Sequence, residues 1–228
     1  SPRENFGELA DRLEAMGATL QLGEHYLDGL DQDVIFRSPG IRPDIPPFLA
    51  AIQQGSVLTS EMEAFFQVCP CKIIADVAVL ELSSFQLMTL QASPDIAVFT
   101  NLSPNHLDVH TSMEEYAQAK ENIFSHQGPG DLAIFNQDND LTRAMAERAP
   151  GRVMKFSRRS ALEEGTYVEH GMIYVAYNGQ KRPLFSTERI LIPGQHNVEN
   201  YLAAIAAVQG MVSDEVILHT AETFPGVE

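Results

Sequence analysis

Short runs of aliphatic and β-branched residues alternate with amphipathic helical segments, and this alternation constrains the fold of the chain more than any other feature. Strand-like runs occupy residues 33–41, 71–75, 95–103, 131–136 and 151–157. Helix-like segments lie at residues 4–17, 46–55, 60–68, 112–126, 141–149, 196–210 and 214–224. Short connections between alternating strands and helices place the strands parallel and the helices on both faces of the sheet. We therefore expect an α/β fold with a mostly parallel sheet.

Local motifs predict where several of these elements begin or turn. A serine followed three residues later by glutamate has the spacing of a capping box, and it predicts helix starts at Ser60 and Ser112. Asn178-Gly179, within an alternating run, predicts a β-hairpin. Further strands are expected at residues 19–23 and 188–192.

One junction in the strand pattern does not look like a normal turn. The run 71–75 (CKIIA) is followed at once by a second buried-type run at 76–84 (DVAVLELSS). Two parallel strands need a crossover of a dozen or more residues, and a hairpin needs a turn. Because Ala75-Asp76 supplies neither, a segment is expected to be missing between residues 75 and 76.

The composition excludes some partners. The 228 residues include 15 basic and 31 acidic side chains, for a net charge of −16, which disfavours nucleic acid because binding to its phosphates depends on basic side chains. A small phosphorylated ligand remains compatible, because backbone amides or a metal ion supply local positive potential. No run approaches the ~20 apolar residues of a membrane span, and the start has no signal-peptide pattern. We expect a cytoplasmic protein with no membrane partner.

Polar groups follow consecutive core elements in the middle of the chain. Glu81 ends one expected strand, Asn101 and His106 follow the next, and Lys120 lies in the helix after that. Ligands of parallel α/β folds collect at the carboxyl ends of the strands. A carboxylate and an imidazole at neighbouring strand ends can share a divalent cation, so we expect these groups to converge on a metal ion.

Three separated motifs carry a resemblance to a known family. They are LELSSFQL at 80–87, FTNLSPNHLDVHTSMEEYAQAKENIF at 99–124 and IPGQHNVENYLAA at 192–204. In this order they resemble the central domain of the Mur ligases of peptidoglycan synthesis, from about residue 69 to the end. The Ser-Ser-Phe-Gln stretch and the SPGI loop at 38–41 resemble the branch of the family that adds D-glutamate.

The resemblance implies both a reaction and a domain plan. ATP would phosphorylate the carboxylate of UDP-N-acetylmuramoyl-L-alanine, and the amine of D-glutamate would attack the acyl phosphate to form an amide, with Mg²⁺ as cofactor. Residues 1–68 would form a Rossmann-like UDP-binding domain without its first strand. Residues 69–228 would form the central ATP-binding domain, of P-loop ATPase type. The family's phosphate loop would lie between residues 75 and 76, and both it and the C-terminal domain are absent from the chain.

The resemblance also implies roles for individual residues. Lys120 matches a lysine that the family carbamylates to make a magnesium ligand, and His106 and Lys120 would be catalytic. The implied magnesium ligands are Glu81, His106 and Lys120. The implied contacts to UDP-muramoyl-alanine are Ser38, Pro39, Gly40, Ile41, Ser83 and Gln86. The implied contacts to ATP and its adenine are Asn101, His196, Asn197 and Asn200.

Two other interpretations of the sequence stay open. His106, Asp108 and His110 loosely resemble a zinc cluster of a metallohydrolase, although the order differs from the common signature and no further histidine cluster completes it. A chain without a phosphate loop could also be a non-catalytic module that binds the UDP-sugar alone. As a ligase, the protein is expected to be a monomer.

Overall fold

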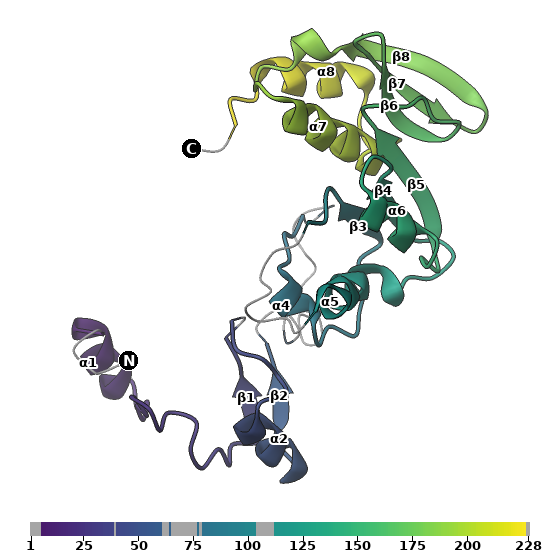
Figure 1. Ribbon diagram of the computed structural model, residues 1–228. Helices are drawn as coiled ribbons and strands as arrows, with labels where there is room; N and C mark the ends of the chain where they lie inside the picture. Colours follow the sequence, from purple (N-terminus) through teal and green to yellow (C-terminus); the bar gives the residue numbers. More distant parts are fainter. Residues whose placement is uncertain are drawn as a thin grey trace. The chain divides into compact units, whose positions relative to one another are not determined.

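The computed structural model describes residues 6–38, 40–60, 64, 77, 79–103 and 112–226 (Figure 1). The chain divides into two compact units, Ser1–Thr89 and Leu90–Glu228. The expected domain boundary at residues 68–69, the junction at 75–76 and the capped helix expected at 60–68 lie outside the described residues, apart from Ser60 and Ala64. Both units combine helices with parallel strands, which confirms the α/β class.

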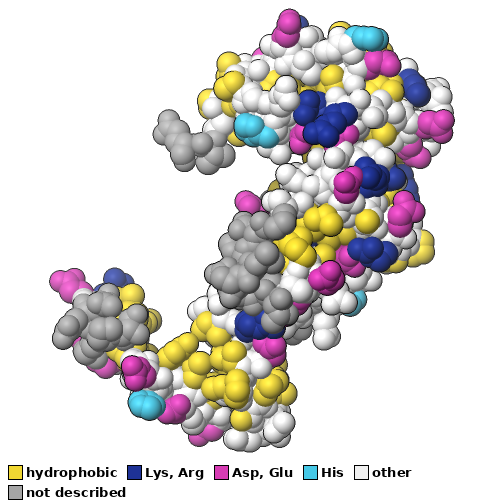
Figure 2. Space-filling model, in the orientation of Figure 1, with side chains coloured by type: hydrophobic (Ala, Val, Ile, Leu, Met, Phe, Trp, Pro, Cys, Tyr) yellow, Lys and Arg dark blue, Asp and Glu magenta, His cyan; other side chains and the backbone are white. Residues whose placement is uncertain are grey.

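The first unit contains a small parallel sheet covered on one side by a helix. The elements given by its described residues are α1 (Glu8–Ala15), β1 (Val34–Phe36), α2 (Pro46–Gln53), β2 (Val57–Thr59) and α4 (Ser84–Leu87). β1 pairs with β2 in parallel, and Ile35 of β1 packs with Phe48 and Ala51 of α2. Figure 2 shows apolar side chains gathered on the surface of this unit. The exposed large apolar side chains of β1, α2 and β2 are Val34, Phe36, Leu49, Ile52 and Val57.

Two strands expected in this part of the chain do not form. Residues 19–22 belong to no strand, and neither do residues 79–83, where the run 76–84 was expected to continue as a buried strand. The side chain of Val79 is 91% exposed. The chain enters helix α4 at Ser84, because Ser83 and Gln86 form a capping box that satisfies the backbone N–H groups at the helix start. The S-x-x-Q spacing therefore signals a helix start where a strand end was expected.

The second unit is built on a six-stranded sheet whose spatial order is the order of the chain. The strands are β3 (Ile96–Phe99), β4 (Leu132–Asn136), β5 (Arg152–Ser157), β6 (Gly165–Glu169), β7 (Met172–Tyr177) and β8 (Gln180–Ser186). The pairings from β3 to β6 are parallel, and β6–β7 and β7–β8 are antiparallel. The expected hairpin at Asn178-Gly179 is confirmed, since both residues have the positive φ that a tight hairpin turn requires, 52° and 75°.

Helices cover both faces of this sheet, as the alternating pattern predicts. They are α5 (Met113–Ser125), α6 (Asp140–Ala146), the 3₁₀ helix η2 (Thr187–Arg189), α7 (Gln195–Ala207) and α8 (Asp214–Thr223). Successive residues of β4 point to opposite faces: Ile134 packs with the α7 and α8 side, and Ala133 and Phe135 pack with the α5 and α6 side. Figure 1 shows α7 and α8 side by side. The strand expected at 188–192 is wrong, because η2 and a bend occupy that stretch.

Aromatic rings fill the core on the α5 side. The ring of Phe135 stacks on that of Phe99, with centroids 5.4 Å apart, and meets the ring of Phe124 edge-on at 5.4 Å. Phe124 reaches this core because α5 starts where predicted, with the Ser112 hydroxyl accepting the N–H of Glu115 at 3.1 Å. Within the part of the chain that is described, no helix has both the length and the apolar character needed to cross a bilayer.

Candidate functional site

Polar side chains gather at the carboxyl ends of β3, β4 and β5 in the second unit. Asn139, the N-cap of α6, donates to the side-chain oxygen of Asn101 at 2.6 Å and to the carbonyl of Leu102 at 2.9 Å. Asn136, the last residue of β4, donates to the carbonyl of Thr100 at 2.9 Å. These bonds fix the loop after β3 against β4. Asn101, one of the predicted ATP contacts, is therefore held by the N-cap residue of α6 while remaining exposed.

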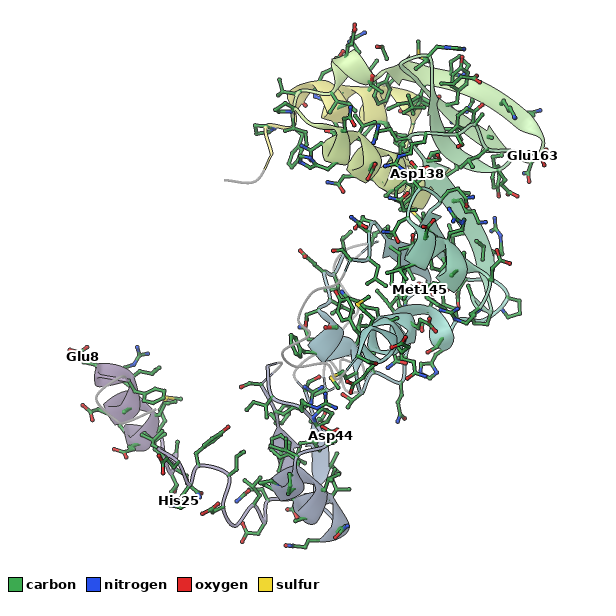
Figure 3. All side chains as sticks on the ribbon, viewed as in Figure 1. Glu8, His25, Asp44, Asp138, Met145 and Glu163 are labelled. Carbon is green, nitrogen blue, oxygen red and sulfur yellow. The ribbon has the colours of Figure 1, made fainter. Side chains whose placement is uncertain are left out.

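Asp138 connects the end of β4 to the end of β5. One carboxylate oxygen accepts the hydroxyl of Ser157 at 2.6 Å, and the other accepts the backbone N–H of Arg158 at 2.7 Å. Ser157 is fully buried, and its hydroxyl oxygen also accepts two further backbone N–H groups of the loop after β5. Figure 3 labels Asp138 in this unit. Because charge-assisted bonds are the stronger kind, Asp138 is a main determinant of this loop.

The loop after β5 is connected in turn to helix α7. The guanidinium Nε of Arg158 donates to the Glu199 carboxylate at 3.1 Å, and both side chains are about three-quarters buried. Glu199 lies in the first two turns of α7, between Asn197 and Asn200. The Arg158–Glu199 pair thus joins the carboxyl end of the sheet to the part of α7 that carries the predicted adenine contacts.

A cavity of about 560 Å³ lies beside the start of α7. Its lining residues are Ile192, Asn197, Asn200, Tyr201, Ala204, Thr220, Phe224 and Gly226. The volume is in the range of small-molecule sites, and the mixture of apolar walls with a few amide groups is typical of them. Burial raises the pKa of the Tyr201 phenol above its ordinary value, so its hydroxyl stays protonated and lies 3.3 Å from the carbonyl oxygen of Thr220.

Three of the predicted adenine contacts lie at this end of α7, but they are placed differently. Asn197 and Asn200 line the cavity and contact each other, with 3.4 Å between Asn200 Nδ2 and Asn197 Oδ1. Asn197 also donates to the carbonyl of Pro193 at 2.7 Å. The ring of His196 folds back over Gly194, where an added Cβ would lie 2.6 Å from it. His196 is exposed and is not among the lining residues.

The predicted contacts to UDP-muramoyl-alanine lie in the first unit. Ser38, Gly40 and Ile41 lie in a tight turn that begins one residue after β1, in which Ile41 N–H donates to the carbonyl of Ser38 at 3.0 Å. Ser83 and Gln86 are half-buried and bonded to each other through the capping box of α4, with 2.9 Å between Ser83 N and Gln86 Oε1. Their polar groups thus cap the start of α4.

The remaining predicted site residues are only partly described. Glu81 is exposed in the first unit, and Lys120 is half-buried on α5 in the second. Pro39 and His106, with the alternative zinc ligands Asp108 and His110, lie outside the described residues. Among the described residues, no group of three or more histidine, cysteine, aspartate or glutamate side chains is arranged to hold a metal.

Glu121, the residue after Lys120, forms an ion pair with Arg148. Glu121 accepts from Arg148 Nε at 3.1 Å, which connects α5 to the residues just after α6. This hydrogen bond raises the pKa of the Arg148 guanidinium, so the arginine remains charged. The helix that carries Lys120 is thereby fixed against α6.

The structure adds residues that the sequence did not single out. Asp138, Ser157, Arg158 and Glu199 form the connection between the strand ends and α7, and Tyr201 and Phe224 line the cavity. Asp138 had a local signal, because N-x-D-N directly after a buried strand places amides and a carboxylate at a strand end. Its partners could not be found in the same way, because Ser157 lies 19 residues further on.

These features define an α/β protein of the kind that binds ligands at the carboxyl ends of parallel strands. Comparison with known proteins gives the family. Residues 70–208 match the family model described as the Mur ligase middle domain. The chain belongs to the Mur ligase family, as its motifs predicted.

Individual relatives agree with this assignment. The chain is 42% identical over 264 residues to a UDP-N-acetylmuramoylalanine–D-glutamate ligase of Acetivibrio thermocellus, covering 96% of the chain and 57% of that protein. It is 36% identical over 274 residues to the protein of the same name from Ruminiclostridium cellulolyticum, covering the whole chain and 59% of the relative. The chain therefore spans somewhat more than half the length of the curated relatives it matches.

Solved structures of related ligases also match. A pseudomurein peptide ligase type C from Methanothermus fervidus matches 96% of the chain and 63% of its own chain, at 14% identity and a TM-score of 0.47. MurF from Acinetobacter baumannii matches 64% of the chain and 32% of its own, at 24% identity and a TM-score of 0.45.

Proposed function

We propose that the protein containing this chain is an ATP-dependent ligase that joins D-glutamate to UDP-N-acetylmuramoyl-L-alanine in peptidoglycan synthesis. The observation that carries the proposal is the identity of 42%, over nearly the whole chain, with a ligase of that name. Family membership and the α/β fold support ATP-dependent amide formation. The naming of the relatives supports D-glutamate as the amino acid added.

The cavity beside α7 is the proposed adenine site. Side-chain amides can offer a donor and an acceptor to a base edge, and Asn197 and Asn200 supply two of them at one side of the cavity. Tyr201 and Phe224 provide aromatic surface, which favours a planar base by stacking. Glu199, held by Arg158, fixes the helix turn between the two asparagines. His196 and Asn101 are proposed to approach the nucleotide from outside the cavity.

The reaction would proceed through an acyl phosphate. The γ-phosphoryl group moves from ATP to the terminal carboxylate of the UDP-sugar substrate. The D-glutamate amine then attacks the carbonyl carbon, forming the amide and releasing inorganic phosphate. Both steps bring anionic oxygens together, so positioning and charge neutralisation matter more than a protein nucleophile.

Magnesium is the ion that this chemistry requires. Bound Mg²⁺ would neutralise and align the phosphate oxygens. Mg²⁺ is commonly held by one or two carboxylates together with substrate phosphates, and the exposed carboxylate of Glu81 fits that chemistry. We propose Glu81 and His106 as ligands, with Lys120 as a further ligand after carbamylation by CO₂. Carbamylation needs a neutral lysine amine, and Lys120 is half-buried on α5.

The contacts to UDP-muramoyl-alanine are proposed at the turn after β1 and at α4. Glycine at position 40 has no side chain within the turn, so a phosphate can approach the backbone closely. Ser83 and Gln86 would receive the muramoyl-alanine end. Pro39 is proposed with Ser38, Gly40 and Ile41.

The domain plan stays part of this proposal, with a UDP-binding region before residue 69 and an ATP-binding region after it. The match to the Ruminiclostridium cellulolyticum ligase runs over 274 positions, although the chain has 228 residues. That relative therefore has dozens of residues within the matched region that have no counterpart here. This supports one or more segments missing from within the chain, and we propose that one of them is the phosphate loop, between residues 75 and 76.

The experiment that tests the proposal uses the full-length gene product. It is mixed with ATP, Mg²⁺, UDP-N-acetylmuramoyl-L-alanine and D-glutamate, and both phosphate release and product mass are measured. We expect one phosphate released for each glutamyl amide formed, with L-glutamate as the control that gives neither. Phosphate release that does not depend on D-glutamate, or no release at all, would refute the ligase assignment.

Two variants test the assignment of the cavity. Asn200→Ala should raise KM for ATP several-fold while leaving KM for D-glutamate unchanged. Gln180→Ala removes an exposed amide on β8 and should change neither constant. Binding of the UDP-sugar without any binding of ATP would instead favour the non-catalytic module, and stoichiometric zinc would favour the hydrolase.

A further inference from the structure

A buried arginine lies between the two segments of the first unit that are proposed to contact the UDP-sugar substrate. Arg37 follows β1 directly and is only 2% exposed, which is rare for an arginine side chain. Its backbone N–H donates to the carbonyl of Thr59 at 2.9 Å, extending the pairing of β1 with β2. The guanidinium group is therefore anchored at a defined point of the small sheet.

The guanidinium contacts both segments. Its Nη1 donates to the carbonyl of Ile41 at 3.2 Å, in the turn after β1. Its Nη2 donates to the carbonyl of Phe85 at 2.8 Å, within α4, and to the hydroxyl of Thr89 at 3.1 Å. Phe85 and Thr89 lie 48 and 52 residues further along the chain. One side chain thus joins two segments that are distant in sequence.

Arginine is suited to this task in a way that lysine is not. Its planar group presents several N–H donors in fixed directions, whereas lysine presents one compact charge. Burying a charged group is costly unless its donors are satisfied. The buried guanidinium would therefore destabilise the chain if its hydrogen bonds were lost. Truncating it would leave the carbonyls of Ile41 and Phe85 without these donors.

We propose that Arg37 is a positioning residue, which holds the turn at residues 38–41 and helix α4 at the spacing needed to bind the two ends of one UDP-sugar substrate. The inference rests on the proposed function, in which the turn receives the uridine nucleotide and α4 receives the muramoyl-alanine end. Arg37 acts through backbone carbonyls and need not touch the substrate. Two binding segments add their contributions only when their spacing matches the ligand.

The test compares a ligand that reaches one segment with a ligand that reaches both. Affinities of UDP and of UDP-N-acetylmuramoyl-L-alanine are measured by calorimetry for the full-length gene product and for Arg37→Lys. In the variant, the gain in affinity that the muramoyl-alanine part adds over UDP alone should fall about tenfold, which is equivalent to about 1.4 kcal/mol. The affinity for UDP itself should change less than twofold. The matched control is Arg42→Lys, because Arg42 forms an ion pair with Asp44 in the same loop region.

A second measurement does not depend on the stability of the variant. In the wild-type protein, UDP alone should slow amide hydrogen exchange at residues 84–89 as well as at the 38–41 turn, because Arg37 couples the two. Thr89→Val removes the hydroxyl acceptor of Arg37 and keeps the side-chain shape, so it should weaken this transmitted protection and lower affinity for the full substrate by a smaller factor.

The outcomes separate the inference from the proposed function. Equal effects of Arg37→Lys on both ligands, or UDP protection confined to the 38–41 turn in the wild type, would overturn the positioning role while leaving the ligase assignment intact. A wild-type protein that binds neither ligand would overturn the proposed function and the inference with it.

Discussion

Replacing Asp138 with asparagine tests whether the carboxylate at the end of β4 organises the loop after β5. The substitution keeps the size of the side chain and removes its charge and one acceptor. With the amide oxygen toward Arg158 N–H, the new NH₂ meets the Ser157 hydroxyl, which already accepts the N–H groups of Arg159 and Ser160 at 3.1 and 2.9 Å. With the oxygen toward Ser157, the NH₂ meets the Arg158 N–H. Either orientation loses a hydrogen bond.

The magnitude follows from the kind of bond that is lost. A hydrogen bond to a charged group contributes about 1.5–3 kcal/mol, so Asp138→Asn should lower the free energy of unfolding of the second unit by about 2 kcal/mol. For a unit of this size that corresponds to a fall in Tm of roughly 4–8 °C. Urea and thermal unfolding followed by circular dichroism measure both quantities. Since the chain has two compact units, the transition of the second unit is the one to fit.

A double-mutant cycle with Ser157→Ala gives the control. Asp138 and Ser157 are in direct contact at 2.6 Å, so their substitutions should be non-additive by about 1 kcal/mol. The loop after β5 also carries Arg158, which bonds Glu199 on α7, so ATP affinity should fall as well. An unfolding free energy within about 0.5 kcal/mol of the wild type, which is typical of surface substitutions, would refute the role assigned to this carboxylate.

Three further predictions concern the second unit. Phe135→Ala should lower the free energy of unfolding in urea by about 3–5 kcal/mol, because Phe135 is fully buried against two other rings. The matched control Phe36→Ala, at a ring that is 61% exposed, should lower it far less, and equal losses would contradict the prediction. Asn178→Ala should lower the free energy of unfolding by about 1 kcal/mol, measured by thermal unfolding, because φ at this position is 52°. Asn178→Gly should be tolerated, and the reverse ranking would refute the turn assignment. Stability should fall as pH rises above about 10, because burial raises the pKa of Tyr201 and the unfolded chain ionises first; Tyr201→Phe should reduce that dependence, and an unchanged pH profile would count against it.

Much of the second unit could be predicted from the sequence, because its signals are local. The spacing of Ser112 and Glu115 predicted the start of α5, and Asn178-Gly179 predicted the hairpin between β7 and β8. The buried runs at 95–103, 131–136 and 151–157 became β3, β4 and β5. In each case a few neighbouring residues fix the backbone, so no distant contact is needed for the prediction.

Two of the strand predictions that proved wrong concern runs whose composition fits a strand as well as another structure. The run at 76–84 has the β-branched composition of a strand, but Ser83 and Gln86 form a capping box and the described part enters a helix. Polar residues at that point fit a ligand contact as well as a helix cap, so the composition of the run does not by itself predict the helix. The run at 188–192 is equally apolar, but η2 and a bend replace the strand.

The tertiary part of the candidate site could not be predicted in this way. The bonds from Asp138 to Ser157, from Arg158 to Glu199 and from Arg37 to Phe85 join residues 19, 41 and 48 positions apart. They form only after strands and helices have packed together, so no short motif announces them. The sequence could predict Asn197 and Asn200 as a pair, but not the aromatic walls that make a cavity beside them.

The order of the six strands has a consequence for synthesis of the chain. Each strand from β3 to β8 pairs with the next one in sequence, so a growing chain can add each strand to a partner that already exists. One face of that sheet, however, including Ile134 and Phe156, is covered by α7, which is complete only at residue 207. An emerging nascent chain would display this apolar face to the ribosome exit and to chaperones until almost the whole unit had been translated.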